Sequence, residues 1–114
     1  MENCLFCRIA AGTLPTELIY QDEQVIGFRD LHPQAPVHCL LIPRQHIATL
    51  NDLTPETDMI MGHLFHGARH LAAQEGIDED GYRTVINCNV AGGQSVYHLH
   101  LHLLGGRSMH WPPG

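Results

Sequence analysis

Three histidines near the C-terminus of this 114-residue chain, His98, His100 and His102, alternate with leucines. In an extended strand, a period of two sends the imidazoles to one face and the leucines to the other. Neighbouring rings would then lie about 6.6 Å apart, close enough to handle one phosphate-sized group or to hold one metal ion. The pattern therefore predicts a chemically active histidine face backed by a leucine core.

Two chemistries suit such a row of imidazoles. It could hold a zinc ion with an open coordination position for hydrolysis, or one ring could attack phosphorus while its neighbours hold the phosphate. The preceding loop favours the second chemistry. Gly92 and Gly93 let backbone N–H groups approach an anion, and Ser95 adds a hydroxyl.

The elements that must position these groups can be read from hydrophobic patterning. Residues 4–12 predict a short helix closed by Gly12, and residues 30–36 predict a loop because they contain two prolines. Strands are predicted at residues 18–20, 25–28, 37–42, 82–87 and 98–104. This order indicates an α+β fold with a helix packed on one face of a sheet.

A long helix is predicted to start at Thr54-Pro55-Glu56 and to end near Gly76. At 100° per residue its apolar residues form one stripe: Met61, Leu64, Phe65, Ala68, Leu71 and Ala72. His63, His66 and His70 lie on the opposite stripe. We interpret them as solvent-facing, because no acidic or thiol ligand accompanies them.

Composition and length limit the classes of binding partner, the number of domains and the cellular location that we expect. Six Lys and Arg against twelve Asp and Glu give a formal charge of −6, which disfavours a nucleic acid or an anionic membrane as partner. The length predicts one domain over residues 1–114, with a core that a partner subunit would help. Without a signal-like or membrane-spanning segment, we expect a cytoplasmic protein.

Four cysteines, Cys4, Cys7, Cys39 and Cys88, are not expected to form disulfides in that compartment. Cys4 and Cys7 form a Cys-x-x-Cys pair, which could bind a metal or could be two reduced thiols at a helix start. A thioredoxin-like redox role is disfavoured because no strand precedes the pair.

The segment Gly92–Arg107 resembles the signature of the histidine triad (HIT) family, His-φ-His-φ-His-φ-φ with φ apolar. The Gly-Gly-Gln-Ser-Val before the triad and the C-terminal Met-His-Trp-Pro-Pro-Gly resemble its nucleoside phosphoramidate hydrolase branch, and residues 28–30 and 33–38 also fit. The resemblance spans nearly the whole chain. It implies a HIT-like fold, an antiparallel five-stranded sheet with one long and one short helix, with sheets joined across a homodimer.

The resemblance also implies a mechanism. His100 would attack the α-phosphorus of a purine nucleoside 5′-phosphoramidate, and water would hydrolyse the nucleotidyl-histidine that forms. His102 would bind phosphate oxygens and Ser95 would give a proton to the departing amine. His98 and His38 complete the predicted catalytic set.

Nucleotide binding is predicted, by the same resemblance, to use a carboxylate on the ribose hydroxyls, an apolar wall for the base and a phosphate cradle. Asp30 would be that carboxylate, and Trp111 would reach toward the partner subunit's site. The full predicted set is Leu5, Phe6, Ile9, Phe28, Arg29, Asp30, Leu31, Asn87, Gly93, Gln94, Ser95, Val96, His100, His102 and Trp111.

Some relatives join a Cys-x-x-Cys pair and two histidines on a structural zinc, and by that match the ligands here would be Cys4, Cys7, His38 and His98. Such a closed site suits structure, so no cofactor is expected for catalysis. Three other functions stay open from the sequence: a dinucleoside polyphosphate hydrolase of the same family, a hydrolase with zinc on the triad, and a non-catalytic purine nucleotide-binding module.

Overall fold

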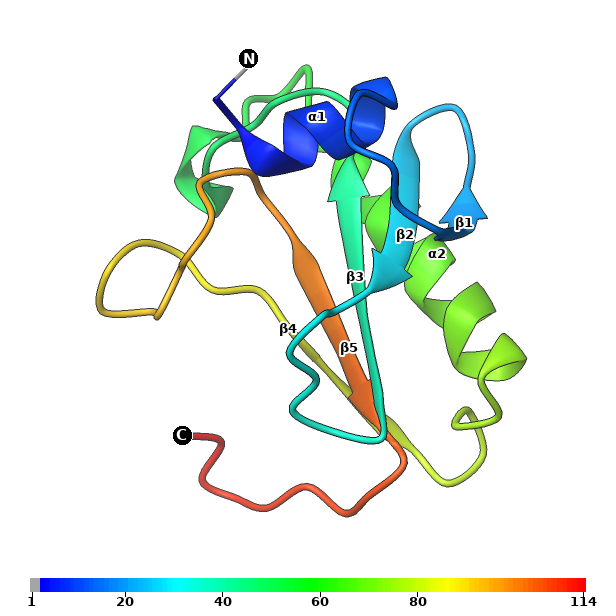
Figure 1. The fold of residues 1–114 in the computed structure, drawn as a ribbon. Helices are drawn as coiled ribbons and strands as arrows, with labels where there is room; N and C mark the ends of the chain where they lie inside the picture. Colours follow the sequence, from blue (N-terminus) through cyan, green and yellow to red (C-terminus); the bar gives the residue numbers. More distant parts are fainter. Residues whose placement is uncertain (1–2) are drawn as a thin grey trace.

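The computed structural model describes residues 3–114, which form one antiparallel sheet with a helix on each face. Its strands follow the order β1-β2-β3-β5-β4 (Figure 1), so β1 and β4 are the edges. The elements are α1 (Leu5–Ala11), β1 (Leu18–Gln21), β2 (Val25–Arg29), β3 (Val37–Pro43), the 3-10 turn η1 (Leu50–Asp52), α2 (Ile60–Gln74), β4 (Tyr82–Val85) and β5 (Leu101–Gly105). The expected α+β class, strand count and two helices are confirmed. The strand predicted at residues 98–104 begins only at Leu101, so His98 and His100 lie on the irregular segment that leads into β5.

The long helix α2 packs on β1, β2, β3 and β5 and encloses the larger core cluster. Leu64, Ala68 and Leu71 of the predicted stripe are buried against Leu99, Leu101 and Leu103. Met61 is only half-buried and Phe65 is exposed, so the stripe is narrower than predicted. His63, His66 and His70 are exposed, as predicted.

The predicted start of the long helix is wrong by about one turn. The chain turns helically from Thr54, where Thr57 N–H and Asp58 N–H both donate to Thr54 O, but the following bonds are of the i to i+3 type. The regular α-helix begins only at Ile60. The Thr-Pro-Glu signal therefore marks a tighter entry turn, and Gly76, with φ 73°, ends the helix as expected.

The short helix α1 lies across one end of the other sheet face (Figure 1). Cys4 Sγ caps it by accepting from Cys7 N–H, and Gly12 closes it in the left-handed region at φ 79°. Phe6 and Ile9 are buried there against Ile26, Phe28 and Leu40. Because strands alternate, β3 and β5 send His38, Leu40 and His102 to this same face.

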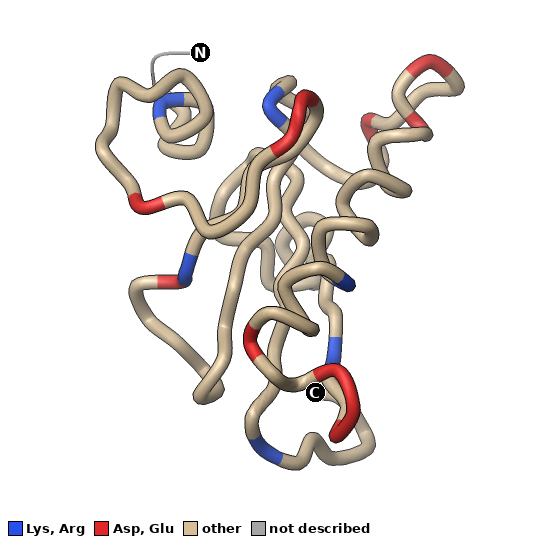
Figure 2. The backbone as a smooth tube through the Cα atoms, turned by 90° about the vertical axis from the view of Figure 1, so that its right-hand side faces the viewer, with Lys and Arg blue, Asp and Glu red and all other residues tan. Residues whose placement is uncertain are grey.

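The charges of the chain are dispersed. Figure 2 shows the Arg residues one at a time along the backbone, interspersed with Asp and Glu. Over residues 3–114, no helix has the length and apolar character needed to cross a membrane.

Candidate active site

The nucleophile predicted from the sequence, His100, is held in one tautomer by the backbone. His100 Nδ1 lies 2.8 Å from His98 O. A carbonyl oxygen can only accept, so Nδ1 carries the proton and Nε2 carries the lone pair. Burial lowers the pKa of His100, and the edge of Phe6 packs against the ring with centroids 5.2 Å apart. The ring is therefore neutral and its Nε2 is suited to nucleophilic attack.

His102 has the opposite tautomer, set through His38. Gln34 N–H donates to His38 Nδ1 at 3.0 Å, so neutral His38 carries its proton on Nε2. That Nε2 lies 2.9 Å from His102 Nδ1, which therefore accepts the bond and leaves the His102 proton on Nε2. His102 Nε2 is buried and has no hydrogen-bond partner among residues 3–114. Such a donor fits an anionic oxygen supplied by a ligand.

The pKa values agree with two neutral rings. Burial lowers the pKa of His38, although Asp30 opposes the shift. Burial, followed by the nearby His100 and His38, lowers the pKa of His102 to about 4. Asp30 Oδ2 lies 3.5 Å from His38 Nε2, while Oδ1 accepts from His32 N–H at 2.8 Å. The structure thus gathers Asp30, His38 and His102 beside His100.

An apolar wall adjoins the histidines. Phe6 and Phe28 pack edge to face with centroids 5.6 Å apart, and Val96 packs against the same cluster together with Ile9. These four residues of the predicted base-binding set are therefore brought together. Two others are not part of the wall, because Leu5 is 43% exposed and Leu31 is 90% exposed.

Two amides of the glycine-rich loop, which the sequence predicts as an anion cradle, are bonded within the loop itself. Gly93 N–H donates to Val90 O and Gln94 N–H donates to Asn89 O, so these two amides are already paired. The buried Gln94 side chain accepts from Asn89 N–H and donates to Ala48 O and Val96 O. Gln94 and Gly93 therefore build the loop that leads into the triad.

The remaining predicted residues lie at the margins of the site. Ser95 is exposed on the segment before His98, and Asn87 is half-buried just after β4. Trp111 is 83% exposed on the tail, where Arg83 donates to His110 O at 2.8 Å.

The prediction that Arg29 binds nucleotide conflicts with the structure. Arg29 follows Phe28 in β2, so its side chain lies on the opposite, α2 side of the sheet. There it forms an ion pair with Glu75 at 2.9 Å. The period of two within residues 25–29 carries this information, because Phe28 and Arg29 cannot share a face.

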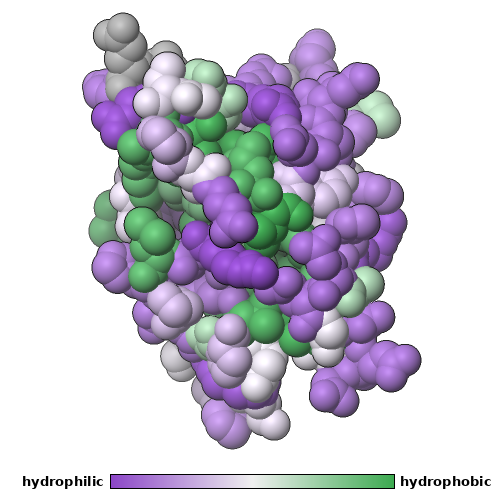
Figure 3. Space-filling model, turned by 45° about the vertical axis from the view of Figure 1, so that its right-hand side comes forward, coloured by the Kyte–Doolittle hydropathy of each residue, from purple (hydrophilic) through white to green (hydrophobic). Residues whose placement is uncertain are grey.

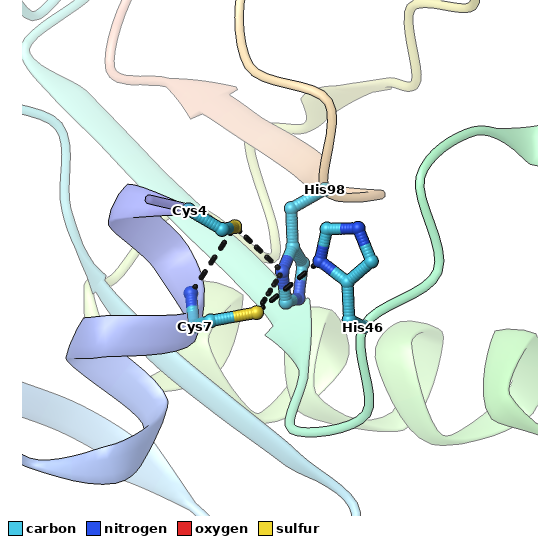
Figure 4. Close-up of side chains that lie close together, drawn as sticks. All are labelled: Cys4, Cys7, His46 and His98. Atoms are coloured by element: carbon cyan, nitrogen blue, oxygen red, sulfur yellow. Dashed lines mark hydrogen bonds between the residues drawn. The ribbon is translucent and has the colours of Figure 1, made fainter. Parts of the chain in front are cut away.

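A second cluster lies at the opposite end of β3 from His38 and joins two thiols to two imidazoles. Figure 4 shows Cys4 and Cys7 of α1 facing His98 and His46. Cys4 Sγ lies 3.4 Å and Cys7 Sγ 3.5 Å from His98 Nδ1, and Cys7 Sγ lies 3.2 Å from His46 Nδ1. His98 Nε2–H donates to Pro43 O at 2.8 Å, so Nδ1 presents its lone pair to the sulfurs. Burial, followed by the neighbouring Cys4, raises the pKa of the Cys7 thiol.

His38, which the resemblance placed in this cluster, lies elsewhere and His46 takes its position. His38 begins β3 opposite Leu104, whereas His98 bonds to Pro43 at the other end of β3. Five residue steps along the strand, from His38 to Pro43, separate the two places by about 17 Å. The sequence signal for His46 is its place just after β3, in the loop that returns past Pro43.

The whole chain resembles known proteins. A family model described as HIT domain matches residues 11–109. The chain is 47% identical over 108 residues to the purine nucleoside phosphoramidase of Escherichia coli, covering 95% of this chain and 91% of that protein.

Solved structures agree with the computed fold. A HIT family hydrolase from Legionella pneumophila superposes with TM-score 0.94 at 52% identity, covering 98% of this chain and 100% of that one. A Zn-bound histidine triad family protein from Mycobacterium smegmatis gives TM-score 0.79 at 36% identity, covering 93% of this chain and 76% of that one. The triad, the sheet that carries it and these matches together show that the chain belongs to the HIT family.

Proposed function

We propose that this protein hydrolyses purine nucleoside 5′-phosphoramidates and that His100 is the nucleophile. The observation that carries the proposal is that hydrogen bonds hold two neighbouring rings in opposite tautomers. His100 has its lone pair on Nε2, and His102 has its proton on Nε2. Attack on phosphorus needs such a pair, one nitrogen to form the bond and one donor to stabilise the charge that builds up on the phosphoryl oxygens. The similarity to the Escherichia coli phosphoramidase supports this substrate class.

In the first step, the His100 Nε2 lone pair forms a bond to the α-phosphorus while the phosphorus–nitrogen bond breaks. The amine leaves with a proton from the Ser95 hydroxyl, an exposed group on the segment before His98. His98 O accepts from His100 Nδ1–H throughout, and it stabilises the positive charge that the ring acquires.

In the second step, water attacks phosphorus, the bond to His100 breaks and the electron pair returns to Nε2. The proton lost by water goes to the Ser95 oxygen, which restores the enzyme. His102 Nε2–H donates to a phosphoryl oxygen in both steps. The products are the nucleoside monophosphate and the free amine.

Nucleotide binding would use the groups that surround this pair. Asp30 can accept two hydrogen bonds from the ribose hydroxyls, and Phe6, Phe28, Ile9 and Val96 offer an apolar surface to a purine. Exposed Leu5 and Leu31 would lie at the rim. Asn87 and Ser95 complete the polar side.

Zinc on the triad, the rival mechanism, is disfavoured by the directions of the rings. His98 Nδ1 faces the cysteine sulfurs, whereas His100 Nδ1 is bonded to the His98 carbonyl. His102 Nδ1 accepts from His38 Nε2–H, so its other nitrogen carries a proton and not a lone pair. The rings therefore do not present lone pairs to one common point.

The second cluster fits a structural zinc, which we propose is held by Cys4, Cys7, His46 and His98. Two sulfurs and two ring nitrogens whose ligand atoms lie within 4.8 Å of one another match a closed tetrahedral site. A bound zinc would cross-link α1 to the loop after β3 and to the segment before β5. The Mycobacterium smegmatis relative is described as Zn-bound.

We also propose a cytoplasmic homodimer. Figure 3 shows hydrophobic residues in a band between hydrophilic ones on one face. The dimer proposal does not depend on that band and is based on the exposed residues that follow. Tyr82 on the edge strand β4, together with Tyr97, Val90 and Trp111, leaves large hydrophobic surface exposed in one chain. Trp111 would then approach the partner's site.

Adenosine 5′-phosphoramidate tests the function. The protein should release AMP and ammonia, and protein quenched during turnover should carry one nucleotidyl group, mapped by mass spectrometry to His100. His100→Ala should lose turnover and the adduct while still binding AMP. Unchanged turnover by that variant excludes the mechanism, cleavage of dinucleoside polyphosphates alone indicates the related hydrolase, and AMP binding without any cleavage indicates a binding module.

A further inference from the structure

The tautomer of His102 depends on a backbone group, the N–H of Gln34, which lies in the loop between β2 and β3. This N–H is the donor that fixes the His38 proton on Nε2 and therefore the His102 proton on its own Nε2. Small shifts of Gln34 would release His38 to carry its proton on Nδ1. His102 would then lose its incoming bond and could present a lone pair to the phosphate, which repels an oxygen anion.

Arg107, in the turn that follows β5, bonds to the backbone carbonyl of Gln34. Its Nη2–H and Nε–H both donate to Gln34 O, at 3.0 and 3.3 Å, and its Nη1–H donates to Ser108 O at 3.1 Å. The guanidinium is planar and presents its donors as a fixed fork, so it restrains a carbonyl in direction as well as distance. Arg107 is exposed and touches neither His38 nor His102 through these bonds.

The chain around Arg107 is shaped for this contact. Gly106 has φ 86°, and a Cβ built there would lie 2.9 Å from Pro36 Cβ. The turn after β5 can therefore approach the β2–β3 loop only because residue 106 is glycine. The Gln34 side chain bonds only within its own loop, where Nε2–H donates to His32 O at 3.0 Å. Arg107, by contrast, ties the Gln34 backbone to the turn after β5.

We propose that Arg107 is a positioning residue for the phosphate-binding imidazole, acting through the Gln34 backbone and His38 to keep the His102 proton on Nε2. Four groups thus form one directional chain: Arg107 to Gln34 O, Gln34 N–H to His38, His38 to His102, and His102 to a phosphoryl oxygen. The low pKa values of His38 and His102 are consistent with one proton on each ring. The last link rests on the proposed function; the first three do not.

The direct test is ¹⁵N NMR of the histidine side chains in the full-length protein, with His102 assigned by comparison with His102→Asn. In the wild type, His102 should show a protonated Nε2 and an unprotonated Nδ1. In Arg107→Ala, both nitrogens should shift toward their average, because two tautomers exchange. Arg107→Lys keeps the charge without the fork and should fall between them. A His102 that keeps the pure Nε2–H pattern in Arg107→Ala overturns the proposal.

Arg44→Ala is the matched control. Arg44 also donates from Nε–H to a loop carbonyl, Asp22 O at 2.9 Å, but in the turn between β1 and β2. It should leave the His102 spectrum unchanged. If Arg44→Ala changes that spectrum as much as Arg107→Ala does, the effect is general loosening and the proposal fails.

A kinetic arm sharpens the result. With adenosine 5′-phosphoramidate, Arg107→Ala should lower kcat about tenfold and change KM less than twofold, because the altered donor acts on the charge that develops during reaction. Arg44→Ala should keep wild-type kcat. If the wild type shows no turnover, the proposed function fails, and the NMR comparison still decides whether Arg107 sets the tautomer. Normal kcat in Arg107→Ala despite mixed tautomers removes His102 from the reaction and overturns the last link.

Discussion

His98 and His100 are two residues apart, but their rings form different hydrogen bonds. His98 donates from Nε2 to Pro43 O and presents Nδ1 to two sulfurs, whereas His100 donates from Nδ1 to His98 O and keeps its lone pair on Nε2. Under the proposed function, the two clusters, Cys4/Cys7/His46/His98 and Asp30/His38/His102 with His100, divide one motif into a structural half and a chemical half. The role of each imidazole follows from what its second nitrogen bonds.

Metal removal should produce the largest effect and should act on stability. Cys7→Ser, or dialysis against a strong chelator, should lose one zinc per chain by elemental analysis. At free zinc a thousandfold above its Kd, binding stabilises by about 4 kcal/mol, or roughly 15 °C in Tm. Cys88→Ser, which removes a cysteine outside the cluster, should keep both the metal and the Tm. Equal metal content in the two serine variants would contradict the assignment.

Substitution in the chemical half should lower activity while leaving metal content and stability unchanged. His102→Ala should lower kcat by about 10²–10³-fold, because it removes one preorganised donor to the phosphoryl oxygens, while metal content and Tm stay near wild type. Stopped-flow turnover and elemental analysis on the same preparation check this. Loss of zinc in this variant would show that the two halves are not separable.

Acid should destabilise the protein through the neutral rings. The pKa of His102 is lowered to about 4, and those of His38 and His100 are also lowered by burial. The unfolded chain, with histidine pKa near about 6.5, binds more protons than the folded chain between pH 6.5 and 4. Stability to urea should therefore fall as pH drops through that window and be fully present above it.

A shallower pH dependence is expected for His102→Asn, because one of the contributing rings is absent. Urea titrations of both proteins at pH 7, 6 and 5 make the comparison. Stability that rises toward pH 5 in the wild type would mean that the rings are charged in the folded state.

The smallest effects should separate the two faces of the sheet. Arg29→Ala removes an ion pair to Glu75 on the α2 side and should cost about 0.5 kcal/mol of stability with KM unchanged. Asp30→Asn, one residue later, should raise KM for the phosphoramidate about tenfold because it weakens a charge-assisted bond to ribose. A KM increase for Arg29→Ala would place its side chain at the nucleotide after all.

Much of the fold could be predicted because its signals are local. The alternation that continues through β5, the glycine after α1 and the apolar stripe of α2 each report a period or a cap that neighbouring residues determine. The same alternation overestimated the strand, because residues 98–100 precede its regular part. The predicted start of α2 at Thr54 is wrong because Thr54 and Pro55 suit a tighter turn as well as an α-helix. Only the hydrogen bonds formed by residues 57–62 distinguish the tighter turn from the helix.

The residue types of the site were predictable from the sequence, but their assembly was less so. His100 and His102 belong to the motif. For the cysteines the resemblance pointed to His38, whereas the structure places His46, in the loop after β3, beside the thiols. Gln94 likewise reads as a phosphate contact, and its amide instead ties the loop to Ala48 and Val96.

By itself, the sequence determined the family, the alternating strand and the set of side chains available for chemistry, since these depend on residue type and spacing. The tertiary structure alone decided which nitrogen of each ring holds its proton and which histidine meets the cysteines. Those outcomes depend on hydrogen bonds between segments far apart in the chain, such as His98 to Pro43 and Gln34 to His38 followed by His102. Spacing along a strand fixes where a ring points, but only its distant neighbours fix what the ring can donate.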